Sequence, residues 1–268
     1  MKPVGERNAT RQIGLARALS KLGYGSRSRA AELIRTGCVS LNGKIRLDPE
    51  TPVSGKHNQI AVNGKLVEPR EMIYLMLNKP RGVVTTASDE KGRGTVYDSL
   101  VYAQYSSNGN NLAQEPMSWV APVGRLDKAS EGLLLLTNDS DWGARIAAPE
   151  THLEKTYHVQ IDTVADEKLL RSLTQGVVAK NGEVLGAKHA RLLRLGEKNC
   201  WLEIVLDEGK NRHIRRMMEG LEVEVLRLVR VAIGPLQLGA LAKGAFRPLT
   251  KEEKRSIDRA MQVRRSHV

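Results

Sequence analysis

The chain has 268 residues, 41% of them hydrophobic, which is enough for one large domain or two smaller domains with buried cores. A formal net charge of +12 favours a polyanionic partner, with nucleic acid as the first candidate. Aromatic residues make up only 4% of the chain, which argues against RNA-binding surfaces that stack several bases on aromatic rings.

The sequence shows no pattern typical of a metal site, a disulfide framework or a membrane segment. Cys38 and Cys200 share no short spacing, and no apolar stretch is long enough to span a bilayer. Residues 1–10 are polar and are predicted to be a flexible N-terminus. We expect a cytoplasmic, monomeric protein without membrane association.

Residues 11–70 are predicted to form a small basic domain. Apolar spacing and glycine stops indicate helices over 12–22 and 26–36, the second capped by Ser26 or Ser28. A hairpin follows over 38–46 with Asn42-Gly43 as its turn, and Asn63-Gly64 repeats this turn chemistry.

The order helix, short helix, G-x-V-x-x-N-G resembles the αL RNA-binding domain of a small-subunit ribosomal protein and many RNA-modifying enzymes. Gly37, Val39, Asn42 and Gly43 carry the likeness, after Ser26 and Arg27. It implies that a basic face grips RNA phosphates, with Arg17, Lys21, Arg27, Arg29 and Arg35 as the RNA-binding residues. The simpler reading is a basic helical cap whose arginines are merely solvated.

Residues 71–250 are predicted to form a second, larger domain. A strand ends near Leu77, and the segment 104–118 is expected to be a loop. Strand-like runs at 156–162, 199–206 and 222–231 alternate with helical runs at 165–175 and 211–220. This mixture indicates an α+β fold on a mostly antiparallel mixed sheet with flanking helices. Residues 251–268 are predicted to be a basic C-terminal tail that begins helically.

Asp127 in GRLDKASEGLLLLTND, residues 124–139, is the candidate for chemistry. Taken alone it would be a turn residue or an N-cap. However, LNKPRGVVTT, EKTYHV, EGKNRHIRRMM and VLRLVRVAIGPL accompany it in the order found in RsuA-type pseudouridine synthases, which modify ribosomal RNA. The resemblance covers about residues 72–250 and, with the N-terminal domain, nearly the whole chain.

The resemblance implies that Asp127 is the catalytic carboxylate of an rRNA pseudouridine synthase. The reaction breaks a glycosidic bond, turns the uracil and rejoins it through a ring carbon, so no cofactor or metal is required. It does require an ionised carboxylate, and attack on the sugar, attack on the ring and removal of a sugar proton all remain open. The target uridine must first be flipped out of its RNA stack.

The resemblance also assigns substrate-binding roles, each with a plainer alternative. Arg125 would hold the flipped state, or else contact phosphate. Tyr157 would stack on the uracil and Leu228 would line its pocket, or both would be ordinary core residues. Arg215 would pair with Asp127 and keep it ionised. Further RNA contacts are expected from four basic residues: Lys79, Arg81, Lys210 and Arg212.

The chain departs from the family pattern in three places. His213 stands where glutamine is common, Glu222 stands where glycine usually ends the helix before the last strand, and the loop at 104–118 is longer than expected. The main alternative function is a non-catalytic rRNA-binding or ribosome-assembly protein. The expected partner in either case is ribosomal RNA, as a structured fragment or an assembly intermediate.

Overall fold

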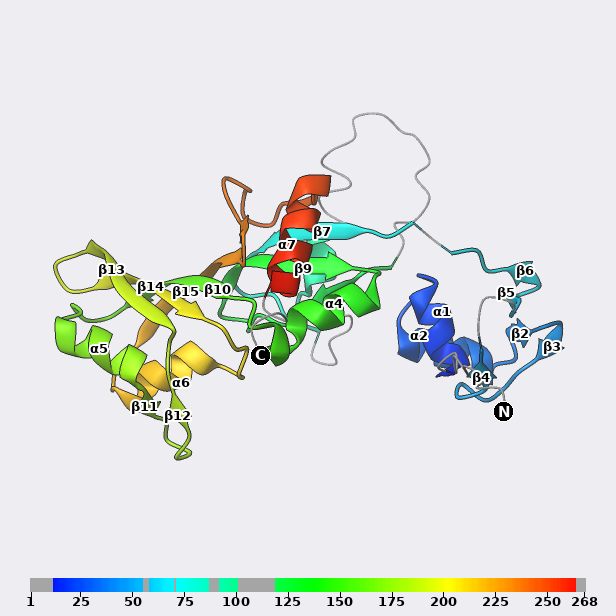
Figure 1. The fold of residues 1–268 in the computed structure, drawn as a ribbon, viewed down its shortest axis with the longest axis horizontal. Coiled ribbons are helices and arrows are strands. Elements are labelled where there is room, and N and C mark those ends of the chain that lie inside the picture. The colour runs from blue at the N-terminus through cyan, green and yellow to red at the C-terminus, as the bar shows by residue number, and fades with distance from the viewer. Residues whose placement is uncertain (1–11, 55–57, 70, 87–91, 101–118, 264–268) are drawn as a thin grey trace, which may run out of the picture. The chain divides into compact units, whose positions relative to one another are not determined.

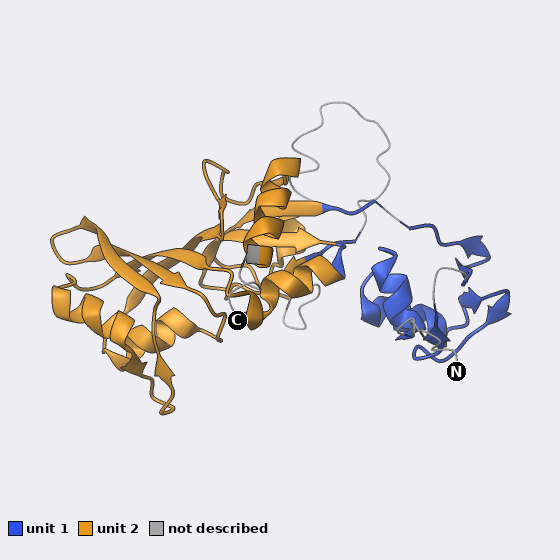
Figure 2. Cartoon of the chain, in the orientation of Figure 1, with its two compact units in different colours: residues 1–73, 113–121, 138–140 blue, residues 74–112, 122–137, 141–268 orange. Residues whose placement is uncertain are grey.

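The computed structural model describes residues 12–54, 58–69, 71–86, 92–100 and 119–263 (Figure 1). The predicted N-terminus 1–10 and the predicted loop 104–118 lie outside these residues. The chain divides into two compact units (Figure 2). Unit 1 comprises Met1–Ile73, Ala113–Ala121 and Asn138–Ser140, and unit 2 comprises Tyr74–Leu112, Pro122–Thr137 and Asp141–Val268.

Unit 1 combines two helices with short strands. Its elements are β1 (Ile13–Gly14), α1 (Leu15–Lys21), α2 (Arg27–Arg35), β2 (Val39–Leu41), β3 (Lys44–Ile45), β4 (Pro52–Val53), β5 (Ile60–Val62) and β6 (Lys65–Leu66). Four strands form a sheet in the order β3-β2-β5-β6, and β1 pairs with β4. Leu15, Leu19 and Ile34 are fully buried against the sheet residues Val39 and Val62.

The local signals in unit 1 act as predicted. Asn42 and Gly43 both have positive φ, 52° and 77°, which is the conformation a two-residue hairpin turn requires. The Ser26 side chain accepts a hydrogen bond of 3.1 Å from the amide of Arg29 and so caps α2. The first helix begins later than predicted, at Leu15, because Ile13 and Gly14 pair with β4.

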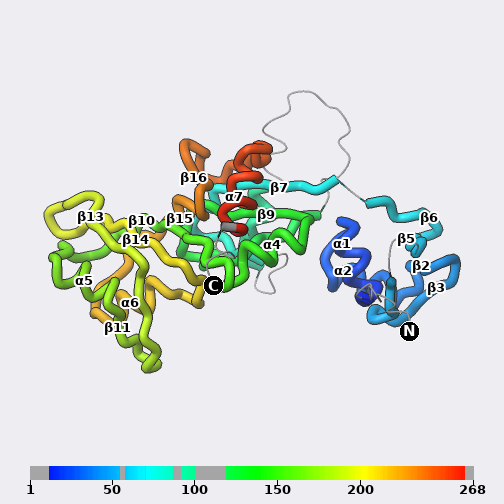
Figure 3. Tube along the Cα trace, in the orientation of Figure 1, coloured from blue at the N-terminus to red at the C-terminus, as the bar shows by residue number. Residues whose placement is uncertain are grey.

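Unit 2 is built on one nine-stranded sheet. Its strands are β7 (Tyr74–Lys79), β8 (Ala121–Val123), β9 (Glu131–Thr137), β10 (Lys155–Ile161), β13 (His189–Leu195), β14 (Cys200–Leu206), β15 (Val225–Ile233), β16 (Leu236–Gln237) and β17 (Phe246–Pro248). The main order is β13-β14-β10-β15-β9-β7-β17, antiparallel except between β15 and β9. β16 folds back on the end of β15 (Figure 3).

Helices pack on this sheet to form two separate cores. The helices of unit 2 are α4 (Ser140–Ala147), η1 (Pro149–Thr151), α5 (Glu167–Gln175), α6 (His213–Gly220) and α7 (Lys251–Val263), and β11 (Val177–Val178) pairs with β12 (Val184–Leu185). α5 and α6 cover β10, β14 and β15 around Leu173 and Met217. α4 and α7 cover β7 and β9 around Trp142 and Ile257 (Figure 1).

The α+β class and the mostly antiparallel mixed sheet are confirmed, with two differences in detail. Residues 251–263 belong to the core of unit 2 rather than to a tail, because Ile257 and Met261 are buried. β13 was not predicted, since most of its residues are exposed. Glu222 adopts the left-handed φ of 58° that glycine would supply. Over the described residues, no helix is long and apolar enough to cross a membrane.

Candidate active site

One cavity of about 160 Å³ in unit 2 brings most of the predicted site residues together. Asp127 and Arg125 line it from the segment between β8 and β9, Tyr157 from β10, and Leu228 from β15. Arg125 is exposed at this cavity, whereas Leu228 is buried. Lys210 and Arg212 reach the same cavity from the segment before α6. Motif residues that lie up to about a hundred positions apart in sequence therefore share one pocket.

Strand register determines which side chains face the cavity. Tyr157 lies opposite Arg230 of β15, and Lys155 lies opposite Ile233. Directly paired residues point to the same face of a sheet, and residues two apart on a strand share a face. All four residues line the cavity. His158, the residue after Tyr157 on β10, points to the opposite face of the sheet and contacts Glu203.

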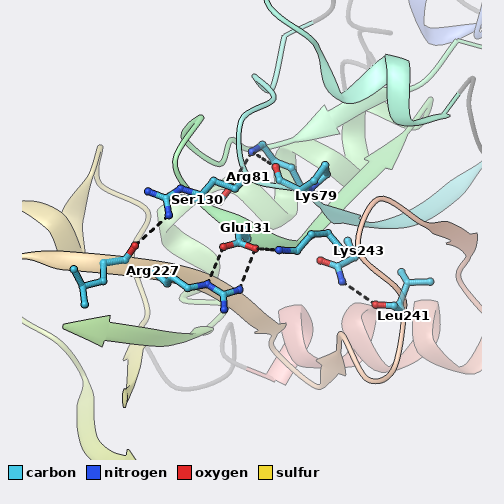
Figure 4. Close-up of polar contacts among 10 residues, drawn as sticks. Lys79, Arg81, Ser130, Glu131, Arg227, Leu241 and Lys243 are labelled. Atoms are coloured by element: carbon cyan, nitrogen blue, oxygen red, sulfur yellow. Dashed lines mark hydrogen bonds and ion pairs between the residues drawn. The ribbon is translucent and has the colours of Figure 1, made fainter. Parts of the chain in front are cut away.

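The loop that carries Asp127 is held by hydrogen bonds from a buried lysine. Lys79 is 0% exposed, and its Nζ donates to the carbonyl oxygen of Ser130 at 2.9 Å (Figure 4). It also donates to the carbonyl oxygen of Asp127 at 3.2 Å. Burial lowers the pKa of Lys79 to about 8, opposed by the charges of Asp127 and Glu131. The predicted RNA contact by Lys79 is wrong, because its ammonium faces the loop and not solvent.

Further hydrogen bonds fix the same loop from the segment after β7 and from within the loop itself. The amide of Gly82 donates to the Lys128 carbonyl at 2.8 Å, and the Thr85 hydroxyl donates to the Leu126 carbonyl at 2.7 Å. The amide of Ser130 closes a turn on the Asp127 carbonyl at 2.9 Å. The Asp127 main chain is therefore preorganised, while its side chain stays 35% exposed to the cavity.

The two arginines near Asp127 differ from the prediction. Arg212, half exposed, is the closer partner, with Nη1 3.9 Å from Asp127 Oδ2. Arg215 instead donates to the carbonyls of Ala129 at 3.2 Å and Val225 at 3.3 Å. Burial lowers the pKa of Arg215, and the charge of Asp127 opposes this. The predicted direct pair of Arg215 with Asp127 is not formed, because these backbone carbonyls hold its guanidinium.

Glu131, four residues after Asp127, is a second anchor that the sequence analysis missed. Its carboxylate is 3% exposed and is bound by Arg227 of β15 and by Lys243 (Figure 4). Burial works against its ionisation, but the hydrogen bonds from Lys243 and Arg227 outweigh it and lower the pKa of Glu131. These ion pairs, in which only the carboxylate is buried, tie the start of β9 to β15.

The remaining predicted RNA contacts lie on the surface. Arg81 is exposed, and its guanidinium donates a hydrogen bond of 3.4 Å to the Leu226 carbonyl (Figure 4). Lys210 is held by Glu208 at 2.9 Å and Glu183 at 3.4 Å, so it is less available to phosphate than predicted. In unit 1, Arg17, Arg27, Arg29 and Arg35 are exposed and Lys21 is partly exposed.

Two cationic residues of the cavity, Lys155 and Arg230, were missed at first. The sequence nevertheless contains a signal for each of them. Lys155 precedes Tyr157 by two residues and Arg230 follows Leu228 by two, so strand alternation predicts a shared face. Lys79 likewise continues the inward series of Leu75 and Leu77.

Comparisons with known proteins agree on one family. The family model described as RNA pseudouridylate synthase matches residues 73–220, and that of the S4 domain matches residues 13–58. The chain is 37% identical over 241 residues to ribosomal large subunit pseudouridine synthase B of Bacillus subtilis, covering 89% of this chain and 93% of the relative. It is 32% identical over 254 residues to an uncharacterized RNA pseudouridine synthase of Aquifex aeolicus, covering 94% and 96%. A crystal structure of a pseudouridylate synthase superposes with a TM-score of 0.60 at 28% identity, covering 91% of this chain and 99% of that one.

Proposed function

Because this chain belongs to the RNA pseudouridylate synthase family, we propose that it converts a uridine of large-subunit ribosomal RNA to pseudouridine, with Asp127 as the catalytic carboxylate. The observation that carries the assignment is the placement of Asp127. Its carboxylate lines the cavity beside Tyr157, while its main chain is held by the fully buried Lys79. The choice of the large subunit rests on the name of the Bacillus subtilis relative.

The chemistry suits a single carboxylate set among cations. The C1′–N1 bond of uridine breaks, the uracil turns, and a C1′–C5 bond forms, so the product is an isomer of the substrate. Asp127 either adds to the substrate or removes a proton from its sugar, and both routes need the ionised form. Arg212, with Nη1 3.9 Å from Asp127 Oδ2, places a positive charge beside this carboxylate.

We place the target base in the cavity in a flipped conformation. A base that is stacked within folded RNA could not enter a recessed cavity of about 160 Å³. Arg125, exposed at this cavity, would contact the RNA stack that the flipped base has left and so hold the flipped conformation. Tyr157 would stack on the uracil, and the buried Leu228 would provide an apolar contact.

RNA binding outside the cavity is assigned to unit 1, which contains the S4 match. Its exposed arginines, Arg17, Arg27, Arg29 and Arg35, would contact phosphates and supply affinity without reading sequence. Because each such contact releases counterions, deletion of residues 1–70 should weaken binding and flatten its salt dependence.

The decisive experiment maps pseudouridine in ribosomal RNA from cells that lack the protein. We expect one or more sites to disappear, to return with the wild-type protein and to stay absent with Asp127→Asn. The purified variant should still bind the RNA fragment. Restoration of the sites by Asp127→Asn would remove Asp127 from the mechanism, and an unchanged map would leave the chain as a binding protein.

A further inference from the structure

Arg230 lines the cavity, and its guanidinium keeps a hydrogen-bond donor without a partner among the described residues. The side chain is 5% exposed and its Nε donates to the Leu133 carbonyl at 2.7 Å, which fixes the guanidinium plane. Its Nη2 is buried and has no hydrogen-bond partner within the described part of the chain. A buried donor without a partner destabilises the folded protein, so such a donor on a residue that lines a pocket suggests a ligand atom that completes it.

Lys155 adds a second cation on the same face. It lines the cavity from β10, two residues before Tyr157, while Arg230 lies opposite Tyr157 on β15. Burial, together with the charge of Arg230, lowers the pKa of Lys155 to about 8, and the charge of Asp207 opposes this shift. The two cations are thus close enough to repel each other, and an electron-rich ligand near both would offset this repulsion.

We propose that Arg230 and Lys155 donate hydrogen bonds to the carbonyl oxygens of the target uracil and stabilise the negative charge on the ring while the glycosidic bond is broken. This inference rests on the proposed function. When the C1′–N1 bond breaks, its electron pair stays on the uracil and spreads over the two carbonyl oxygens. Attack of C5 on C1′ then uses that electron density, C5 loses its proton, and N1 gains one.

A ring carbonyl fits the site better than a phosphate. Arg125 and Arg212 are exposed at this cavity and are suited to the RNA backbone, whereas Arg230 is almost fully buried. Fixed donors in a water-poor site act most strongly on charge that develops during the reaction. The same donors would disfavour cytosine, which carries an amino group where uracil has an oxygen.

The test combines protein and substrate changes. Ribosomal RNA fragments carry uridine, 2-thiouridine or 4-thiouridine at the mapped target, since sulfur accepts hydrogen bonds weakly. Single-turnover rates at saturating RNA are measured for the wild type, Arg230→Met, Lys155→Met and Arg171→Met. Arg171 is the matched control, because it lies exposed on α5 and pairs with Glu167.

We expect each cavity variant to react roughly 100-fold more slowly with uridine, as for loss of one oxyanion donor, with RNA affinity unchanged. One sulfur position should slow the wild type about tenfold or more, and this effect should shrink to about twofold in the variant that lost the matching donor. Arg171→Met should behave as the wild type.

Two outcomes separate this inference from the proposed function. If the wild type modifies uridine RNA and both sulfur effects persist unchanged in both variants, the inference is wrong and the proposed function stands. If the wild type modifies no RNA, the proposed function fails. Should Arg230→Met not fold, Lys155→Met, at a partly exposed position, decides the question by the same comparison.

Discussion

Replacing Lys79 with Met tests whether the buried ammonium holds the catalytic loop. Lys79 Nζ donates to three carbonyls, those of Pro80 at 3.1 Å, Asp127 at 3.2 Å and Ser130 at 2.9 Å. Hydrogen bonds from a charged group contribute about 1.5–3 kcal/mol each. The cost of burying the charge, seen in the fall of its pKa from 10.5 to about 8, offsets about 3 kcal/mol of this. We expect Lys79→Met to lower the free energy of unfolding of unit 2 by about 2–4 kcal/mol.

The same pKa gives the prediction a pH signature. Below pH 8 the Lys79 amine is charged in both the folded and the unfolded chain, so the stability difference between wild type and variant is constant. Between pH 8 and 10.5 the folded protein loses a proton that the unfolded chain keeps. The wild type should therefore gain up to about 3 kcal/mol relative to Lys79→Met over this interval.

Urea unfolding in a Trp119→Phe background, followed by the fluorescence of the remaining Trp142 and Trp201 of unit 2, measures the two effects. The control is Lys128→Met, which removes an exposed lysine one residue after Asp127. Single-turnover rates should fall about 100-fold in Lys79→Met, because a small displacement of the Asp127 loop misplaces the carboxylate. A variant within about 0.5 kcal/mol of wild type at pH 7, with no growing difference above pH 8, would refute this role of Lys79.

Gly132→Ala should prevent folding of unit 2 or lower its stability by more than about 4 kcal/mol in urea unfolding, since a Cβ there would collide with the main chain of Arg230 and φ is 102°. Glu222→Gly should raise stability by about 0.5–1 kcal/mol by relieving the left-handed φ of 58°, and a loss would contradict this reading. In single-turnover assays, Arg215→Met should slow the reaction about 100-fold because Arg215 holds the loop carbonyl. Arg212→Met should slow it less than about tenfold, because its contact with Asp127 is long and half exposed, and the reverse order would show that the direct ion pair matters more.

Turns and helix caps could be predicted from the sequence because each depends only on residues that are close together in the chain. The Asn42-Gly43 turn requires two positive φ angles, and the Ser26 cap acts within one helical turn. Motif order placed Asp127 and Tyr157 in one site, and the cavity brings the two together. Their catalytic roles stay predictions.

Non-local contacts could not be predicted in the same way. Lys79 was taken for a surface cation because lysine is rarely buried, and only the carbonyls of a loop 48 or more residues away explain its position. The exchange of Arg212 and Arg215 follows from backbone geometry, since Arg212 precedes α6 with a left-handed φ of 49°. The helix predicted over 211–220 would include Arg212 as a helical residue and so would orient its side chain relative to Arg215 in another way.

The position of α7 has a consequence for how the protein is made. Residues 251–263 leave the ribosome after every strand of the sheet, yet Ile257 and Met261 pack with Met76, Leu135 and Trp142. A nascent chain that stops before α7 leaves these apolar side chains exposed, and contacts between such distant residues close slowly. The indole of Trp142 donates to Asp258 of α7 at 2.8 Å, so this hydrogen bond also cannot form before α7 is present. The core around β7 and β9, which supports the Asp127 loop, is therefore completed only after residues 251–263 have been synthesised and have packed against it.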